Sequence, residues 1–186
     1  MAKKEIRFVG IDDSPYTKGD KSSLLIATFF RGGLALDGVM SCSAAVDGDD
    51  ATERMAGMIL KSKFRRQVQC IFLDGIAVAG FNVVDVQELH RKTGMPVIVV
   101  MRRYPDLEGM RRALVKMGQE RKFEVIQKAG PITRINSICI QSFGLSPGEA
   151  KEFLDIACTR SFLPEPIRVA HLIAAGVVKG ESRGRA

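Results

Sequence analysis

The sequence predicts a mixed α/β fold, in which three antiparallel strands are followed by parallel strands that helices connect, with helices flanking the sheet. In the first part of the chain, strand-like runs follow one another with only short turns between them. Further along, short apolar runs alternate with segments of helical periodicity, as in parallel crossover units. The 186 residues are 46% hydrophobic and 26% charged, average values for a globular protein, so we expect one domain over residues 1–186.

The first three predicted strands are Ile6 to Ile11, Leu24 to Phe30 and Leu34 to Val46. The first runs into Asp12-Asp13-Ser14-Pro15, where the proline prevents further pairing. Gly32-Gly33 separates the other two and favours a hairpin, because glycine adopts positive φ at little cost. Gly38 either marks a bulge in the third strand or shifts the turn.

The middle of the chain alternates helices and strands. The predicted elements are a helix from about Asp50, a strand over Val68 to Leu73, a helix over Val83 to Lys92, a strand over Pro96 to Met101 and a helix from about Asp106. Asp50 to Glu53 matches a capping box in which Asp replaces Ser or Thr. The first of these strands stops at Asp74-Gly75, so a second carboxylate follows a strand.

The last third contains two predicted strands, Phe123 to Lys128 and Ile135 to Phe143, and two predicted helices, which begin near Ser146 and Pro164. Ser146-Pro147-Gly148-Glu149 has the capping residue and first-turn proline of a helix start. The final helix is apolar nearly all round from Ile167 to Val178, so we expect it to pack into the body. Residues 180–186 are expected to form a flexible tail.

The predicted order, βββαβαβα, is the layout of the ribonuclease H-like fold. In that layout the first strand lies centrally, with the antiparallel strands on one side and the parallel strands on the other. The ends of the first and fourth strands then become neighbours. We therefore expect Asp12 and Asp74 to lie close together.

Clustered carboxylates at strand ends indicate a site for a hard divalent cation such as Mg²⁺, which prefers oxygen ligands. Such a cation supports phosphodiester hydrolysis. The candidates are Asp12, Asp13, Asp74 and one of Asp47, Asp49, Asp50 and Glu53. Each acid also has a structural interpretation, as a turn residue or a helix cap.

His171 lies within the apolar final helix, where a histidine is either a hydrogen-bonded core residue or, if it faces the carboxylates, a group that transfers protons. The four cysteines are widely separated and are expected to be reduced core residues. No apolar run reaches the roughly 20 residues that span a bilayer, and the N-terminus has no targeting segment, so we expect a cytoplasmic protein. The net charge of +7 favours a polyanionic partner.

Several segments together resemble the archaeal endonuclease dU family, which is related to endonuclease V. The resemblance runs nearly end to end. It is carried by Gly10-Ile11-Asp12-Asp13, Phe30-Arg31-Gly32-Gly33, Leu36-Asp37-Gly38-Val39, Asp47 to Glu53, Leu73-Asp74-Gly75-Ile76, Ala79 to Asp85, Pro96 to Leu107, Pro164 to His171 and Gly180 to Ala186. It implies a ribonuclease H-like fold and Mg²⁺- or Mn²⁺-dependent cleavage of a nucleic-acid strand at or near a deaminated base such as deoxyuridine.

By this resemblance, Asp12 and Asp74 correspond to the metal-binding aspartates, and Glu53 to the glutamate at a helix start, although Asp50 or Asp13 can take that role. His171 corresponds to a histidine brought to the active site. The sequence has no Tyr-Ile-Pro segment like the strand-separating wedge of endonuclease V, so the resemblance does not extend to inosine specificity.

The expected partner is nucleic acid, DNA rather than RNA, with phosphates contacted by arginines. The candidates for this role are Arg102, Arg103, Arg111, Arg112 and Arg168. Two alternatives remain. One is a nucleic-acid-binding protein without catalysis, whose binding needs no divalent metal, and the other is a nucleotide phosphohydrolase that uses the same carboxylates.

Overall fold

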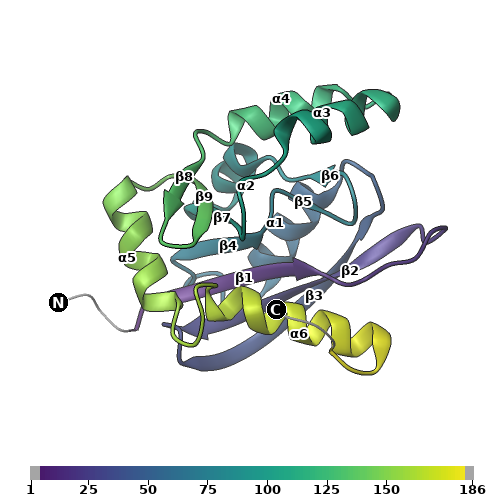
Figure 1. Cartoon of the computed structure of the whole chain (residues 1–186). Coiled ribbons are helices and arrows are strands. Elements are labelled where there is room, and N and C mark those ends of the chain that lie inside the picture. Colours follow the sequence, from purple (N-terminus) through teal and green to yellow (C-terminus); the bar gives the residue numbers. More distant parts are fainter. Residues whose placement is uncertain (1–4, 183–186) are drawn as a thin grey trace.

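The computed structural model describes residues 5–182 and contains a seven-stranded sheet with the order β3-β2-β1-β4-β7-β9-β8 (Figure 1). Its strands are β1 (Arg7–Asp13), β2 (Ser22–Arg31), β3 (Ala35–Ala45), β4 (Cys70–Asp74), β7 (Val97–Met101), β8 (Thr133–Ile135) and β9 (Ile138–Phe143). A small separate hairpin consists of β5 (Ala77–Val78) and β6 (Asn82–Val83). The helices are α1 (Ala51–Lys61), α2 (Val86–Thr93), α3 (Leu107–Lys116), α4 (Arg121–Lys128), α5 (Pro147–Ala157) and α6 (Glu165–Lys179).

The pairing confirms the predicted mixed sheet. Strand β1 pairs antiparallel with β2, which pairs antiparallel with β3, and on its other side β1 is parallel to β4 and β4 to β7. Of the two interpretations of Gly38, the structure has the bulge, because Phe29 pairs with Gly38 while Phe30 pairs with Leu36, which leaves Asp37 as the extra residue.

Hydrophobic side chains fill both faces of the sheet, and alternate residues of the central strands β1 and β4 enter different cores. Val9, Ile71 and Leu73 belong to the core that α1 and α2 cover. Phe8 and Phe72 belong to the core that α5 and α6 cover. Even-numbered residues of β1 and β4 therefore face α6, which decides the direction of Asp12 and Asp74.

Two predictions about the last third were wrong. Phe123 to Lys128 is part of helix α4, not a strand, because Lys122 and Ile126 lie on one helical face and are buried together. The predicted strand Ile135 to Phe143 is divided by a turn in which Asn136 adopts a positive φ of 54°. The resulting β9 returns antiparallel to β7 instead of extending the parallel strands.

The predicted capping box at Asp50 does not form. Asp50 stands at the N-cap of α1, but its carboxylate accepts hydrogen bonds from the Ala45 amide and from Asn82, while the Asn82 side chain accepts the Ala51 amide in its place. The carboxylate thus joins the end of β3 to α1. By contrast, the capping box predicted at Ser146 and Glu149 is present.

Helices α2 and α6 differ from the predicted helices at their ends. Helix α2 begins at Val86, later than predicted, because Asn82 and Val83 form β6 and Asp85 caps the helix. The last turn of α6 is not packed into the body, since Val177 and Val178 are exposed. Gly180 ends α6 in the left-handed conformation, and residues 183–186 of the predicted tail lie outside the described residues.

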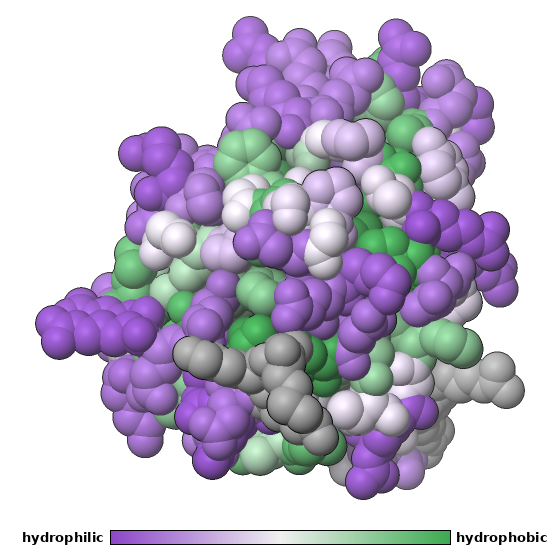
Figure 2. Space-filling model, turned by 90° about the vertical axis from the view of Figure 1, so that its left-hand side faces the viewer, coloured by the Kyte–Doolittle hydropathy of each residue, from purple (hydrophilic) through white to green (hydrophobic). Residues whose placement is uncertain are grey.

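The outer surface is polar over much of one side. Figure 2 views the molecule from the side on which β1 begins, and hydrophilic residues project over most of this face, most densely at the top, over the α3–α4 layer seen in Figure 1. Among residues 5–182, no helix combines the length and apolar character needed to cross a membrane.

Helix α6 lies unusually close to β1 at Gly10. A Cβ added there would lie 2.5 Å from the Ile167 nitrogen and closer still to the Pro166 carbonyl carbon. Beside it, buried Thr28 donates a hydrogen bond from its hydroxyl to the Pro166 carbonyl oxygen at 2.6 Å. The absence of a side chain at position 10 therefore lets the first turn of α6 sit directly on the sheet.

Gly10→Ala should lower the free energy of unfolding by at least about 2 kcal/mol, because the backbone of α6 cannot yield to the added methyl group. Urea unfolding measures the change. The matched control is Gly57→Ala in α1, where the new methyl group meets nothing within 4 Å and should be neutral or slightly stabilising. A Gly10→Ala protein as stable as wild type would contradict the close approach of α6.

Candidate active site

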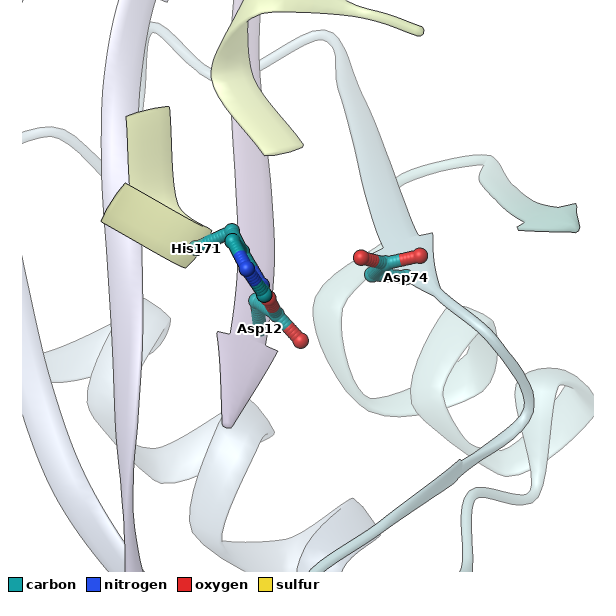
Figure 3. Close-up of side chains that lie close together, drawn as sticks. All are labelled: Asp12, Asp74 and His171. Carbon is teal, nitrogen blue, oxygen red and sulfur yellow. The ribbon is translucent and has the colours of Figure 1, made fainter. Parts of the chain in front are cut away.

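Asp12 and Asp74 are brought together by the register of the parallel strands. Ile11 pairs with Leu73, so the next residue of each strand carries its carboxylate at the same edge of the sheet. Both side chains point to the α6 face (Figure 3). Asp12 keeps only 7% of its side-chain surface exposed and Asp74 9%.

His171 reaches this edge from α6. The contact of Pro166 with Gly10 and Thr28 fixes the start of the helix, and the imidazole lies against Asp12 (Figure 3). His171 Nδ1 and Asp12 Oδ2 are 2.8 Å apart. His171 thus faces the carboxylates, which favours the proton-transfer interpretation over the core interpretation.

Asp12 alters the protonation of both neighbours, Asp74 and His171. Burial raises the pKa of Asp74 above its ordinary value, and the neighbouring Asp12 carboxylate raises it further. The hydrogen bond to Asp12 raises the pKa of His171. The site therefore favours a proton on His171 and disfavours an unpaired negative charge on Asp74.

Arg102 compensates the charge of Asp74. Asp74 pairs with Val100 across β4 and β7, and Arg102 lies two residues further along on the same face. Its guanidinium holds the carboxylate with two hydrogen bonds, Nη1 to Oδ1 at 3.0 Å and Nη2 to Oδ2 at 3.1 Å. This pair could not be predicted from sequence, because Arg102 follows the apolar run of β7 like any surface residue.

Asp13 points to the other face of the sheet but borders the same pocket, which has a volume of about 590 Å³. Its carboxylate accepts a hydrogen bond from the Ala79 amide at 2.9 Å. Burial raises the pKa of Asp13 to about 6, with smaller contributions from the charges of Asp12 and Asp74. Tyr16, which the sequence analysis did not single out, also lines this pocket.

The structure does not bring Glu53 to this group. The side chain of Glu53 is 70% exposed, and its carboxylate contacts Lys92 Nζ at 2.7 Å on the opposite side of the sheet from α6. The remaining acids of the β3–α1 loop have structural partners. Asp47 accepts the Phe81 amide, Asp49 pairs with Lys122, and Asp50 joins β3 to α1 as described above.

The predicted phosphate-binding arginines have different environments. Arg168 forms an ion pair at 2.7 Å with the buried Glu165 one turn earlier in α6, so its guanidinium is already engaged. Arg102 is held by Asp74 but also borders the pocket. Arg103 is exposed, and Arg111 and Arg112 are exposed on α3.

The residues at this edge fit a divalent cation. One donor atom from each of Asp12, Asp74 and His171 lies within 4.8 Å of the others. Among residues 5–182, these three form the one cluster of potential metal ligands with at least three members. Each Asp74 oxygen accepts one hydrogen bond from Arg102 and keeps a lone pair for a further partner. Carboxylate oxygens such as those of Asp12 and Asp74 suit Mg²⁺ or Mn²⁺.

With a chelator present, the free energy of unfolding should fall as the pH rises from about 4 to above 6.5. The pKa of Asp13 is higher in the folded state, about 6, than its ordinary value of 3.8, so ionisation in this window costs stability. His171 acts in the same direction, because its contribution is present below its ordinary pKa and is lost as the pH rises through the raised folded-state value.

Asp13→Asn should remove most of the decline between pH 4 and 6, which amounts to at most about 3 kcal/mol for a shift of this size. Urea unfolding at a series of pH values measures it. Asp155→Asn, at an exposed position on α5, is the matched control and should leave the profile unchanged. An unaltered slope in Asp13→Asn would show that this carboxyl is not responsible.

The architecture is shared with solved structures. A crystal structure of a protein of unknown function from Archaeoglobus fulgidus superposes with a TM-score of 0.86 at 39% identity, covering 92% of this chain and 97% of that one. Endonuclease V of Ciona intestinalis, in complex with DNA that contains inosine, superposes with a TM-score of 0.61 at 14% identity, covering 95% and 87%. This likeness confirms the predicted ribonuclease H-like fold.

The sequence comparisons identify the family. A UPF0215 protein of Methanothermobacter thermautotrophicus is 48% identical over 190 residues, an alignment that covers 99% of this chain and 93% of the relative. The model of the family described as endonuclease dU matches residues 4–178. The match includes Asp12, Asp74 and His171, and the chain therefore belongs to the endonuclease dU family.

Proposed function

We propose that this protein is a metal-dependent endonuclease that hydrolyses a phosphodiester bond in nucleic acid, DNA rather than RNA, at or near a deaminated base such as deoxyuridine. The observation that carries the proposal is the convergence of Asp12, Asp74 and His171 on one edge of the sheet. Membership of the endonuclease dU family and the fold shared with endonuclease V support it.

Asp12 and Asp74 are the proposed ligands of Mg²⁺ or Mn²⁺. When bound, such a cation lowers the pKa of a coordinated water and neutralises charge on a phosphate. The two buried carboxylates provide the negative charge that this cation requires, and Arg102 keeps the Asp74 carboxylate fixed in orientation. The site is thus arranged before substrate arrives.

His171 has a proposed role in proton transfer. Its Nδ1 is held by Asp12, which favours the protonated ring and leaves Nε2 as the nitrogen not engaged by Asp12. A proton on Nε2 can pass to the oxygen that leaves phosphorus when the strand is cut. Asp12 therefore orients the histidine as well as contributing to the cation site.

The third carboxylate is Asp13 in this proposal, although Glu53 is the residue that the family resemblance favoured. Asp13 borders the same pocket as Asp12 and Asp74, and the charges of these two carboxylates add to the effect of burial in raising the pKa of Asp13. Glu53 is exposed and paired with Lys92. Asp13 is therefore a better candidate than Glu53 for the third carboxylate of the cation site.

Asp74→Asn should lower the cleavage rate by at least about 100-fold, because one charged oxygen ligand is lost. The measurement is cleavage of labelled single- and double-stranded oligonucleotides that carry deoxyuridine, hypoxanthine or no lesion, with Mg²⁺, Mn²⁺ or a chelator. Asp155→Asn controls for the loss of an aspartate elsewhere. Cleavage by Asp74→Asn at the wild-type rate, or cleavage in chelator, would refute the proposed centre. Hydrolysis of nucleoside triphosphates instead of oligonucleotides would indicate a nucleotide phosphohydrolase.

Asp13→Asn and Glu53→Gln distinguish the two candidates for the third carboxylate. We expect Asp13→Asn to reduce cleavage by about 10-fold or more and to raise the Mn²⁺ concentration that gives half-maximal activity. Glu53→Gln should change both values less than about 2-fold, because it removes only an exposed ion pair. The opposite ranking would assign the role to Glu53.

A further inference from the structure

A second pocket adjoins the candidate active site. It has a volume of about 300 Å³ and is bordered by Arg102, Arg103, Tyr104 and Arg134 among other residues. Arg102 also borders the pocket that contains Asp12, Asp74 and His171. The two pockets therefore share one wall, and a ligand in the second lies next to the reacting centre.

The second pocket carries positive charge that the described protein does not neutralise. Arg102 is paired with Asp74, but among residues 5–182 no carboxylate forms an ion pair with Arg103 or Arg134. Within the described residues, the Arg134 guanidinium makes one long hydrogen bond, 3.4 Å, to the Asn136 carbonyl oxygen. Free guanidinium groups in a concave site suit phosphate oxygens, which they bind in a bidentate manner.

Tyr104 adds an aromatic surface to this charge. Tyr104 is 66% exposed, so its ring is accessible to a ligand. Pro105 follows it and disfavours helical backbone at Tyr104. Exposed aromatic rings beside arginines are the arrangement on which unpaired nucleic-acid bases stack.

The strand register explains why these groups meet. Met101 pairs with Cys139 at the end of β7, and Cys139 also pairs with Arg134 across the β8–β9 hairpin. Arg134 thus lies beside the segment that leaves β7 and carries Arg103 and Tyr104. The antiparallel hairpin, which the sequence analysis did not predict, builds the second side of the pocket.

We propose that this pocket binds the unpaired nucleotide next to the cleaved phosphodiester bond, with its base stacked on Tyr104 and its phosphates bound by Arg103 and Arg134. The proposal rests on the endonuclease function and names its substrate class, a single-stranded or locally unpaired strand. In an intact duplex, neighbouring bases cover both faces of each internal base, so Tyr104 has no internal base face to contact.

Tyrosine fluorescence tests the stacking directly, because the chain contains two tyrosines and no tryptophan. In Tyr16→Phe, Tyr104 is the remaining emitter. With a chelator present, a 15-nucleotide single-stranded DNA should quench this emission, whereas a blunt duplex of the same sequence should not. RNA of the same sequence is tested in parallel. Quenching by either strand supports the pocket, and comparing the two identifies the preferred sugar.

Binding affinities provide the second readout. Tyr104→Ala should weaken binding of the single strand by about 10-fold or more, whereas Tyr104→Phe should retain it, because phenylalanine also stacks. Arg103→Ala and Arg134→Ala should each reduce the salt dependence of binding by about one counterion. Arg66→Ala is the charge-matched control, since Arg66 lies before β4, at the opposite end of the sheet.

Unchanged Tyr104 emission at saturating single strand, or equal affinity of Tyr104→Ala and wild type, would overturn the proposal. Equal quenching by the duplex would also overturn it. These results are separate from those for the proposed function, because no cleavage occurs in chelator. Quenching without metal-dependent cleavage of any substrate would refute the endonuclease and leave the binding pocket, whereas duplex cleavage without quenching would refute the pocket alone.

Discussion

The parallel pairing of β1 with β4 is the constraint on which the candidate site depends. Because side chains alternate between the faces of a sheet, the pairing of Ile11 with Leu73 commits Asp12 and Asp74 to the same face and the same edge. A shift of one residue in either strand would turn its aspartate to the α1 face. The buried residues on both faces of these strands prevent that shift, since it would exchange the contents of the two cores.

Placing two carboxylates side by side in a largely buried site is unfavourable, and the surrounding structure offsets this cost. Arg102 compensates the negative charge of Asp74 with its guanidinium, and His171 is hydrogen-bonded to Asp12. Both partners come from elements whose positions are set independently, Arg102 by the pairing of β4 with β7 and His171 by the contact of α6 with Gly10 and Thr28. The acids are therefore supported by the sheet and the final helix together.

The sequence was sufficient for what local pattern determines. Runs of buried strand residues that end in aspartates, Asp12 and Asp74, gave the mixed sheet and the meeting of the two acids. It was insufficient where a partner far along the chain decides. Asp50 matches a capping box locally, yet Asn82 takes over the cap, and Phe123 to Lys128 looks like a strand until the burial of Lys122 and Ile126 marks one helical face.

The same distinction applies to the site residues. The prediction that His171 faces the active site rested on the family resemblance. Its apolar neighbours in the sequence fit a core histidine equally well. Glu53 stood in a helix start next to other acids, but helix α1 covers the face of the sheet opposite to α6, so its carboxylate pairs with Lys92 instead. Neither outcome is encoded in the spacing of residues along the chain.

Arg102 connects the two pockets and gives the site a polarity. On one side lie the carboxylates of Asp12 and Asp74, which repel a phosphate unless a cation is between them. On the other side lie Arg103 and Arg134, which attract a phosphate directly. A guanidinium has five N–H donors, and Arg102 uses two of them in its hydrogen bonds to Asp74. Donors thus remain for the proposed nucleic-acid strand, whose backbone would lie between the basic and the acidic groups as it crosses from one pocket to the other.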